Sequence, residues 1–173
     1  MAIRNIRLHG DNILRKVAKP VELFDDKLHT LLNDMLDTLR KHNGMGIAAP
    51  QVGVLKRIAM VEIEKETDTK KKKKQQQLET EYGFYELINP VIVETEGETQ
   101  ENEACLSLPG KNAPLARPDR IVVQAVDRQG TPYTVVGTGV MARAMCHEID
   151  HLDGIMYVDL IEPGTLRDNK DGE

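Results

Sequence analysis

The feature that most constrains this chain is a pair of histidines near its C-terminal end, in the segment His147-Glu148-Ile149-Asp150-His151. Residues four apart in an α-helix lie one turn apart on the same face, so both imidazoles can reach one metal ion. Glu148 lies beside them, where its carboxylate can act as a base. The spacing therefore predicts a helix that carries a metal site together with a proton acceptor.

The residues around this pair favour a helix. One stripe at helical spacing carries the histidines, and a neighbouring stripe is apolar. The first stripe consists of Val140, Ala144, His147 and His151, and the second of Met141, Met145, Ile149 and Leu152. Gly154 lies just past the last periodic residue, where a glycine commonly ends a helix. We expect this helix to be buried, because one face is apolar and another bears ligands.

Metal sites that catalyse hydrolysis usually have three protein ligands and one position for water, so a third ligand must come from elsewhere. Downstream, Tyr157 stands where an extended metalloprotease motif has a histidine, and Glu162 is too close behind the helix to return easily. We therefore expect an upstream ligand, and Cys105 offers a thiolate that suits a borderline-soft metal. A lone cysteine can equally be a small buried hydrophobic residue. A metallopeptidase built on the histidine pair is a further alternative.

Three segments, in order along the chain, resemble the signature motifs of the peptide deformylases: Gly44–Gln51, Glu103–Ser107 and His147–His151. The resemblance spans about residues 1–162. It implies an α+β fold in which antiparallel strands pack around a C-terminal helix that carries the HExxH motif. It also implies a metal-dependent hydrolase that removes the N-formyl group from the N-terminal formylmethionine of newly made peptides and releases formate.

The resemblance assigns roles to individual residues. Cys105, His147 and His151 would bind the metal, and Glu148 would carry the proton. The Gln51 side chain and the Leu106 backbone N–H would stabilise the oxyanion. The peptide site would include Gly46, Ala144 and Arg143, and the ligands would be supported by Glu103, Arg117 and Asp150. Arg117 and Asp150 could instead form an ordinary surface ion pair.

The ligand set does not by itself identify the metal. Zinc suits a cysteine and two histidines by softness and geometry. The resemblance instead implies Fe(2+) as the working ion, with Zn(2+), Ni(2+) or Co(2+) able to substitute. The expected cofactor is therefore one divalent metal ion.

Four positions depart from the family pattern. Ala104 replaces a glycine, Cys146 a glutamine and Asn112 an arginine that grips the peptide backbone, while Arg143 puts a charge where many members have an aliphatic pocket residue. These changes leave open a deformylase-like protein with an altered acyl-peptide substrate, or one that only binds peptide or metal. Cys146 is turned about 100° from His147 on a helix, so we expect it to pack rather than to coordinate.

Charge and composition bear on location and partners. The net charge of −5 and the pI near 5.6 argue against nucleic acid binding by the protein as a whole, so no DNA partner is expected. The N-terminus has charges inside its only apolar stretch, and no run approaches transmembrane length, so neither a signal peptide nor a membrane partner is expected. We expect a cytoplasmic protein whose partners are nascent formylated peptides. Transient ribosome association is a further partner that the resemblance raises. The polar tail, residues 163–173, shows no basic amphipathic helix that would support it.

The rest of the chain is expected to form one catalytic domain over residues 1–162. Leucines at helical spacing predict a helix over residues 25–42, and strands are predicted at 57–63 and 84–93, with a hairpin around 127–130. A short capped helix is expected after Asp11. Residues 64–81, with the lysine run Lys70–Lys74, are predicted to form a charged mobile insertion, and contact of this run with RNA is the alternative.

Overall fold

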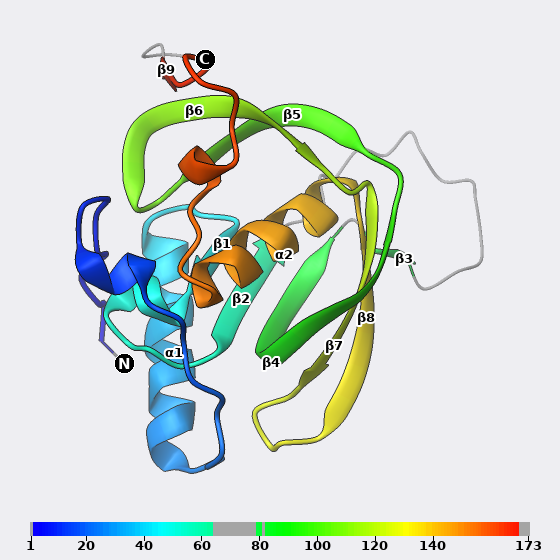
Figure 1. Cartoon of the computed structure of the whole chain (residues 1–173). Coiled ribbons are helices and arrows are strands. Elements are labelled where there is room, and N and C mark those ends of the chain that lie inside the picture. The colour runs from blue at the N-terminus through cyan, green and yellow to red at the C-terminus, as the bar shows by residue number, and fades with distance from the viewer. Residues whose placement is uncertain (1, 64–78, 81, 170–173) are drawn as a thin grey trace, which may run out of the picture.

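The computed structural model describes residues 2–63, 79–80 and 82–169 (Figure 1). The insertion predicted at 64–81 lies outside the described residues except for Glu79–Thr80, and so do the last residues of the polar tail. Two mainly antiparallel sheets and two α-helices make up most of the described part. The α+β class and the central placement of the C-terminal helix are as predicted.

The larger sheet has the strand order β1-β2-β4-β7-β8-β3. All neighbours are antiparallel except β3 and β8, which are parallel. Its strands are β1 (Gly46–Ala48), β2 (Ile58–Ile63), β3 (Glu79–Thr80), β4 (Gly83–Glu96), β7 (Arg120–Val126) and β8 (Pro132–Thr138). The hairpin predicted around residues 127–130 joins β7 to β8, with Val126 opposite Pro132.

The smaller sheet has the order β5-β6-β9, with β5 at Thr99–Cys105, β6 at Leu108–Arg117 and β9 at Arg167–Asp168. The sequence analysis did not predict β5 and β6 as strands. They form a hairpin whose register slips between Ala104 and Cys105. This irregularity places Cys105 at the tight end of the hairpin, opposite Leu108.

Helix α1 runs from Asp26 to Lys41, close to the predicted range of 25–42. The Asp25 carboxylate accepts a hydrogen bond from the Leu28 N–H at 3.0 Å and so caps the first turn. Its leucine stripe is buried against β1 and β2 and contributes Leu28, Leu31, Leu32, Met35 and Leu39 to one hydrophobic cluster. The short helix predicted after Asp11 is a 3-10 turn, η1 (Asn12–Arg15), capped by the Asp11 side chain.

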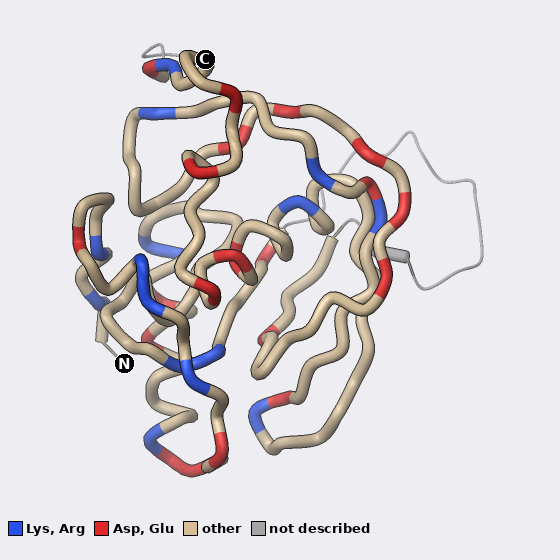
Figure 2. Tube along the Cα trace, viewed as in Figure 1, with Lys and Arg blue, Asp and Glu red and all other residues tan. Residues whose placement is uncertain are grey.

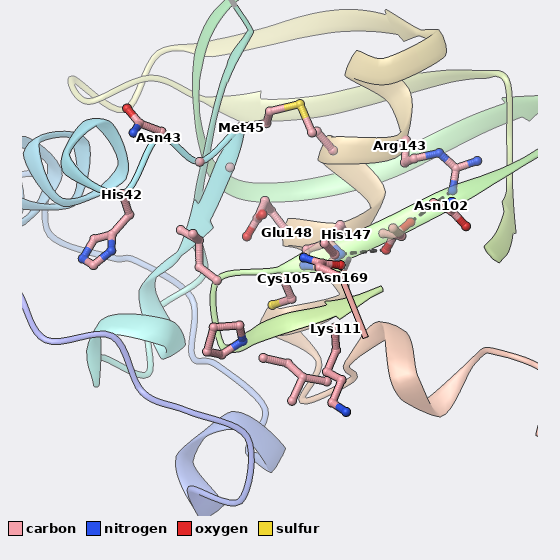
Figure 3. Close-up of a pocket in the computed structure, with 18 of the residues that line it drawn as sticks. His42, Asn43, Met45, Asn102, Cys105, Lys111, Arg143, His147, Glu148 and Asn169 are labelled. Atoms are coloured by element: carbon pink, nitrogen blue, oxygen red, sulfur yellow. Dashed lines mark hydrogen bonds and ion pairs between the residues drawn. The ribbon is translucent and has the colours of Figure 1, made fainter. Parts of the chain in front are cut away.

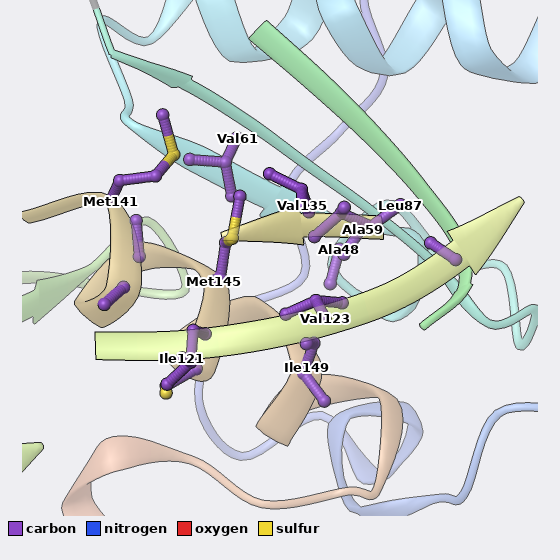
Figure 4. Close-up of a cluster of buried hydrophobic side chains, with 14 of the residues drawn as sticks. Ala48, Ala59, Val61, Leu87, Ile121, Val123, Val135, Met141, Met145 and Ile149 are labelled. Atoms are coloured by element: carbon purple, nitrogen blue, oxygen red, sulfur yellow. The ribbon is translucent and has the colours of Figure 1, made fainter. Parts of the chain in front are cut away.

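Helix α2 runs from Gly139 to Leu152 and lies between the two sheets (Figure 1). The predicted apolar stripe packs on the larger sheet, and this cluster is shown in Figure 4. Among its members are Met141, Met145, Ile149, Val61, Val123 and Leu87. Gly154 has a φ of 75°, so it makes the left-handed turn that was predicted to follow the helix. The sheet therefore fixes one face of α2 and leaves the histidine face toward the β5–β6 hairpin.

Asn89-Pro90 lies inside β4, whose pairing with β7 is irregular between Ile88 and Val91. Asn89 has a φ of 51°, a conformation that asparagine tolerates better than most residues. Its side-chain amide is hydrogen-bonded to the backbone N–H and C=O of Val21, at 2.8 and 2.9 Å. These bonds fix the irregular point of the strand to the chain just before α1.

Two short 3-10 turns complete the described elements, η2 (Ala49–Val52) and η3 (Tyr157–Asp159). Acidic and basic residues are both scattered along the trace in the view of Figure 2. In the described part of the chain, every helix is too short or too polar to span a membrane.

Candidate metal centre

Cys105, His147 and His151 lie together, as the sequence predicted. Their ligand atoms all lie within 4.8 Å of one another, and all three residues are buried. Cys105 Sγ is 3.2 Å from His151 Nε2. The cysteine ends β5 and both histidines come from α2, so the third ligand lies upstream of the helix.

Hydrogen-bond donors surround the Cys105 sulfur. The Ser107 backbone N–H donates to Sγ at 3.4 Å, and the Gln51 side-chain amide donates to it at 3.5 Å. Donors of this kind stabilise negative charge on sulfur, and the thiolate is the form that binds metal. The tight turn after Cys105 therefore places the sulfur next to two hydrogen-bond donors.

Glu103 fixes the orientation of the His147 ring. Its Oε1 lies 2.6 Å from His147 Nδ1, which leaves Nε2 to face Cys105 and His151. Burial alone would raise the pKa of Glu103, but the hydrogen bonds from His147 and Arg117 hold it at about 2. Glu103 is therefore a carboxylate at neutral pH, although it is only 5% exposed.

Two arginines surround this carboxylate. Arg117 binds Glu103 through two hydrogen bonds, at 2.7 and 3.1 Å, and binds Asp150 at 2.6 Å. The Arg117 side chain is only 7% exposed, so the cluster is not the ordinary surface pair of the alternative interpretation. Arg143 donates to Glu103 at 3.2 Å and also to two carbonyl oxygens, of Leu115 at 2.8 Å and of Thr99 at 2.9 Å.

The charges around the histidines fit a bound cation. Burial lowers the pKa of His151 to about 3, so its imidazole is neutral and can coordinate. Burial would also lower the pKa of His147, but its contacts with Cys105 and Glu103 raise that pKa well above the usual value. The same negative groups that favour a proton on His147 favour a metal ion at that place.

Glu148 lies next to the ligands and is 4% exposed. Its Oε2 is a buried oxygen without a hydrogen-bond partner among the described residues, so it is free to bind water or substrate. Burial raises the pKa of Glu148 to about 7. Gly46 lies against this side chain, since a Cβ at that position would be 2.5 Å from Glu148 Oε1.

A pocket of about 550 Å³ opens onto Cys105, His147 and Glu148 (Figure 3). Gly46, Leu106, Ala144 and Arg143, all predicted for the site, are among the residues that line it. Gln51 is buried beside Cys105, to which its amide donates. Asp150 and Arg117 lie behind the ligands instead, as part of the Glu103 cluster.

The departures from the family pattern have separate structural consequences. Ala104 is not among the described residues with positive φ, so its methyl group causes no backbone strain. Cys146 packs in the hydrophobic cluster under α2, and burial raises the pKa of its thiol to about 11, which disfavours the thiolate. The Asn112 side chain donates a hydrogen bond to Asn169 and is held along the β6–β9 pair.

Three features of the site were not predicted. Ser107, fully buried, accepts a hydrogen bond from the Gln51 amide. The Tyr157 ring stacks on His147 with 6.0 Å between ring centroids. The backbone N–H groups of Arg7 and His9 bind the carbonyl oxygens of Gln51 and Ser107. Ser107 could have been suspected from its place two residues after the ligand, but backbone bonds leave no signal in side-chain identity.

Comparison with known proteins finds similarity to peptide deformylases over nearly the whole chain. Residues 3–166 match the family model for polypeptide deformylase. A peptide deformylase of Acetivibrio thermocellus is 47% identical over 161 residues, which cover 93% of this chain and 85% of that protein.

Solved structures of peptide deformylases are similar to this chain in fold as well as in sequence. The crystal structure of a peptide deformylase from Legionella pneumophila is 41% identical, with a TM-score of 0.81, and the match covers 94% of this chain and 88% of that one. The peptide deformylase from Ehrlichia chaffeensis is 33% identical, with a TM-score of 0.87, and the match covers 94% and 89% of the two chains. With its Cys-His-His metal site and these likenesses in sequence and fold, the chain belongs to the polypeptide deformylase family.

Proposed function

We propose that this peptide deformylase cleaves the formyl amide of N-formylmethionyl peptides with Glu148 as the proton carrier, releasing formate and a peptide with a free amino terminus. The observation that carries the proposal is the position of the Glu148 carboxylate. It lies beside Cys105, His147 and His151 at the pocket, and its buried Oε2 has no partner among the described residues. A carboxylate so placed can take a proton from the attacking water and later deliver it to the leaving amine.

We propose Fe(2+) as the metal that Cys105, His147 and His151 hold, with Zn(2+), Ni(2+) or Co(2+) able to substitute. The mixed sulfur and nitrogen donors support a first-row transition metal. When bound, such an ion polarises a carbonyl and lowers the pKa of water to about 7. Glu103 would keep the His147 ring in place, and Arg117 and Asp150 would in turn hold Glu103.

The oxyanion formed by attack on the formyl carbon would be stabilised by the Gln51 side-chain amide and the Leu106 backbone N–H. The Gln51 amide supports this role because it lies next to Cys105 and is buried from water. The Gly46 backbone, Ala144 and Arg143 would contact the peptide, in keeping with their place in the pocket wall.

We also infer that residues 1–162 fold as one catalytic domain and that the protein works in the cytoplasm. Its substrates would be formylated peptides as they are made, which would bring it into transient contact with the ribosome. The chemistry of the substrate supports this setting, because formylmethionine is at the amino end of a newly made peptide.

A changed preference among acyl peptides is the second candidate. Asn112, in place of a peptide-gripping arginine, is bonded to Asn169 rather than exposed to the pocket. If this loss altered the substrate, formyl-Met-Ala-Ser would be a poor substrate, and peptides with another acyl group or first residue would react faster.

The test is formate release from formyl-Met-Ala-Ser by protein purified anaerobically and loaded with Fe(2+). We expect rapid turnover by the unchanged protein. Glu148→Ala should keep the metal and lose hydrolysis, whereas Cys105→Ala should lose both. Metal content measured on the same samples separates the two effects, and retained turnover in the Glu148→Ala variant would remove its assignment as proton carrier.

A further inference from the structure

The side-chain amide of Gln51 is held at both ends. Its Oε1 accepts a hydrogen bond from the Ala48 N–H at 2.8 Å, and its Nε2 lies 3.2 Å from Ser107 Oγ and 3.5 Å from Cys105 Sγ. A backbone N–H can only donate, so the end facing Ala48 must be the carbonyl oxygen. The orientation of the amide is thereby fixed, with its NH₂ group toward the metal ligand.

The NH₂ group of Gln51 has two acceptors, the Ser107 hydroxyl oxygen and the Cys105 sulfur. Since the group carries two hydrogens, one can bind each acceptor. Gln51 is 1% exposed and Ser107 is fully buried, so water does not compete for these bonds. A hydrogen bond in such a setting restrains its partner more than an exposed one does.

The backbones under both side chains are also fixed, and by the same segment. The Arg7 N–H donates to the Gln51 carbonyl oxygen and the His9 N–H to the Ser107 carbonyl oxygen, each at 2.7 Å. The N-terminal segment thus anchors the backbones of both residues. The backbone that carries the Ser107 hydroxyl is consequently not free to follow the amide as it moves.

We propose that Ser107 is a positioning residue for deformylation, with its hydroxyl oxygen holding one amide hydrogen of Gln51 so that the other is directed to the oxyanion. This rests on the role proposed above for Gln51. Ser107 does not touch the substrate itself. Its contribution is orientation, which matters because a donor aimed in advance stabilises developing charge without reorganising.

The test compares holoenzymes carrying Ser107→Ala and Ser107→Thr. The alanine variant keeps the backbone N–H that binds Cys105, so metal content should not change. We expect its kcat for formyl-Met-Ala-Ser to fall about tenfold, as for the loss of one buried hydrogen bond, with KM unchanged. Ser107→Thr, which restores the hydroxyl, should recover most of the rate.

Thr38→Val is a matched control, because Thr38 is also a fully buried hydroxyl but binds the Arg4 N–H and the Asp34 carbonyl oxygen away from the pocket. It should lower the melting temperature and leave kcat unchanged. An equal fall of kcat in this control would mean that loss of any buried hydroxyl slows the enzyme, which contradicts the proposal.

A double-mutant cycle with Gln51→Ala decides between positioning and packing. If Ser107 acts through Gln51, then Ser107→Ala should cost little once Gln51→Ala is present. An undiminished cost in that background overturns the inference and leaves the role of Gln51 intact. Full activity of Gln51→Ala alone would instead refute the proposed role of Gln51, so the two failures are distinguishable.

Discussion

At the scale of single residues, the site depends on the absence of a side chain as much as on the side chains present. Gly46 lies directly against Glu148: an added Cβ would be 2.5 Å from Oε1 and 2.7 Å from Cγ. The φ of Gly46 is not positive, so the backbone would accept alanine and the obstacle is the Glu148 side chain. Glycine at this position therefore leaves room for the carboxylate that we propose as the proton carrier.

We expect Gly46→Ala to push the Glu148 carboxylate out of place and to lower kcat about a hundredfold, because small displacements of reacting groups are costly. Metal binding should survive, since no ligand is touched. Metal content and formate release measured on one preparation test this. Gly130→Ala is the control: Gly130 has a φ of 84° and a Cβ there would lie 3.3 Å from Phe24 Cδ2, so the variant should lower the melting temperature without slowing the reaction. An unchanged kcat in Gly46→Ala would show that the added methyl group does not displace the Glu148 carboxylate.

At the scale of elements, Arg143 connects helix α2 to both long strands of the smaller sheet. Its guanidinium donates to the Thr99 carbonyl of β5, the Leu115 carbonyl of β6 and the Glu103 carboxylate. The side chain is only 12% exposed. The histidines come from α2 and the cysteine from β5, so this arginine joins the two halves of the metal centre.

We expect Arg143→Met to lower the free energy of unfolding by about 2 kcal/mol, because it leaves buried acceptors without a donor. Denaturant unfolding of the metal-free protein measures this. Arg15→Met removes a more exposed pair with Asp159 and should cost less than about 1 kcal/mol. An Arg143→Met variant of normal stability would contradict the role of Arg143 as a connection between elements, whatever its effect on KM.

The elements also show what could be predicted from the sequence. Helix α1 and the α2 face were predictable because buried leucines and methionines recur at helical spacing. Strand β5, TQENEAC, could not be recognised, because its buried residues are Glu103 and Cys105, and the partners of the Glu103 charge are distant in the sequence. The metal ligands followed from spacing and motif order. The restraint of Gln51 by Ala48, Arg7 and Ser107 did not, since it depends largely on backbone groups.

At the scale of the whole molecule, the N-terminal segment fastens α1 to the site. The Asp34 carboxylate on α1 accepts a hydrogen bond from the Ala2 N–H at 2.7 Å and is paired with Arg4 at 3.0 Å. Further along, the segment reaches the Gln51 and Ser107 carbonyl oxygens. One extended stretch therefore connects the helix packed outside the larger sheet with two of the three sequence motifs.

This connection predicts how stability responds to acid. Burial by itself would raise the pKa of Asp34, but the Ala2 N–H and the Arg4 guanidinium hold it below its usual value. A carboxyl group whose pKa is lower in the folded state stabilises that state above its unfolded pKa of about 3.9, and the contribution is lost as the pH falls through the folded value. Asp34→Asn, which cannot ionise, should therefore be less stable than the unchanged protein at pH 7, by about 1 kcal/mol.

The difference should shrink as the pH is lowered through the acid range, because the unchanged protein then loses the same charge. Urea unfolding at several pH values measures both curves. A difference that stays constant from neutral to acid pH would mean that Asp34 acts through its shape and its hydrogen bonds, not its charge. The rate of formate release at pH 7 should be unaffected, because the backbone bonds from Arg7 and His9 to the site remain in the variant.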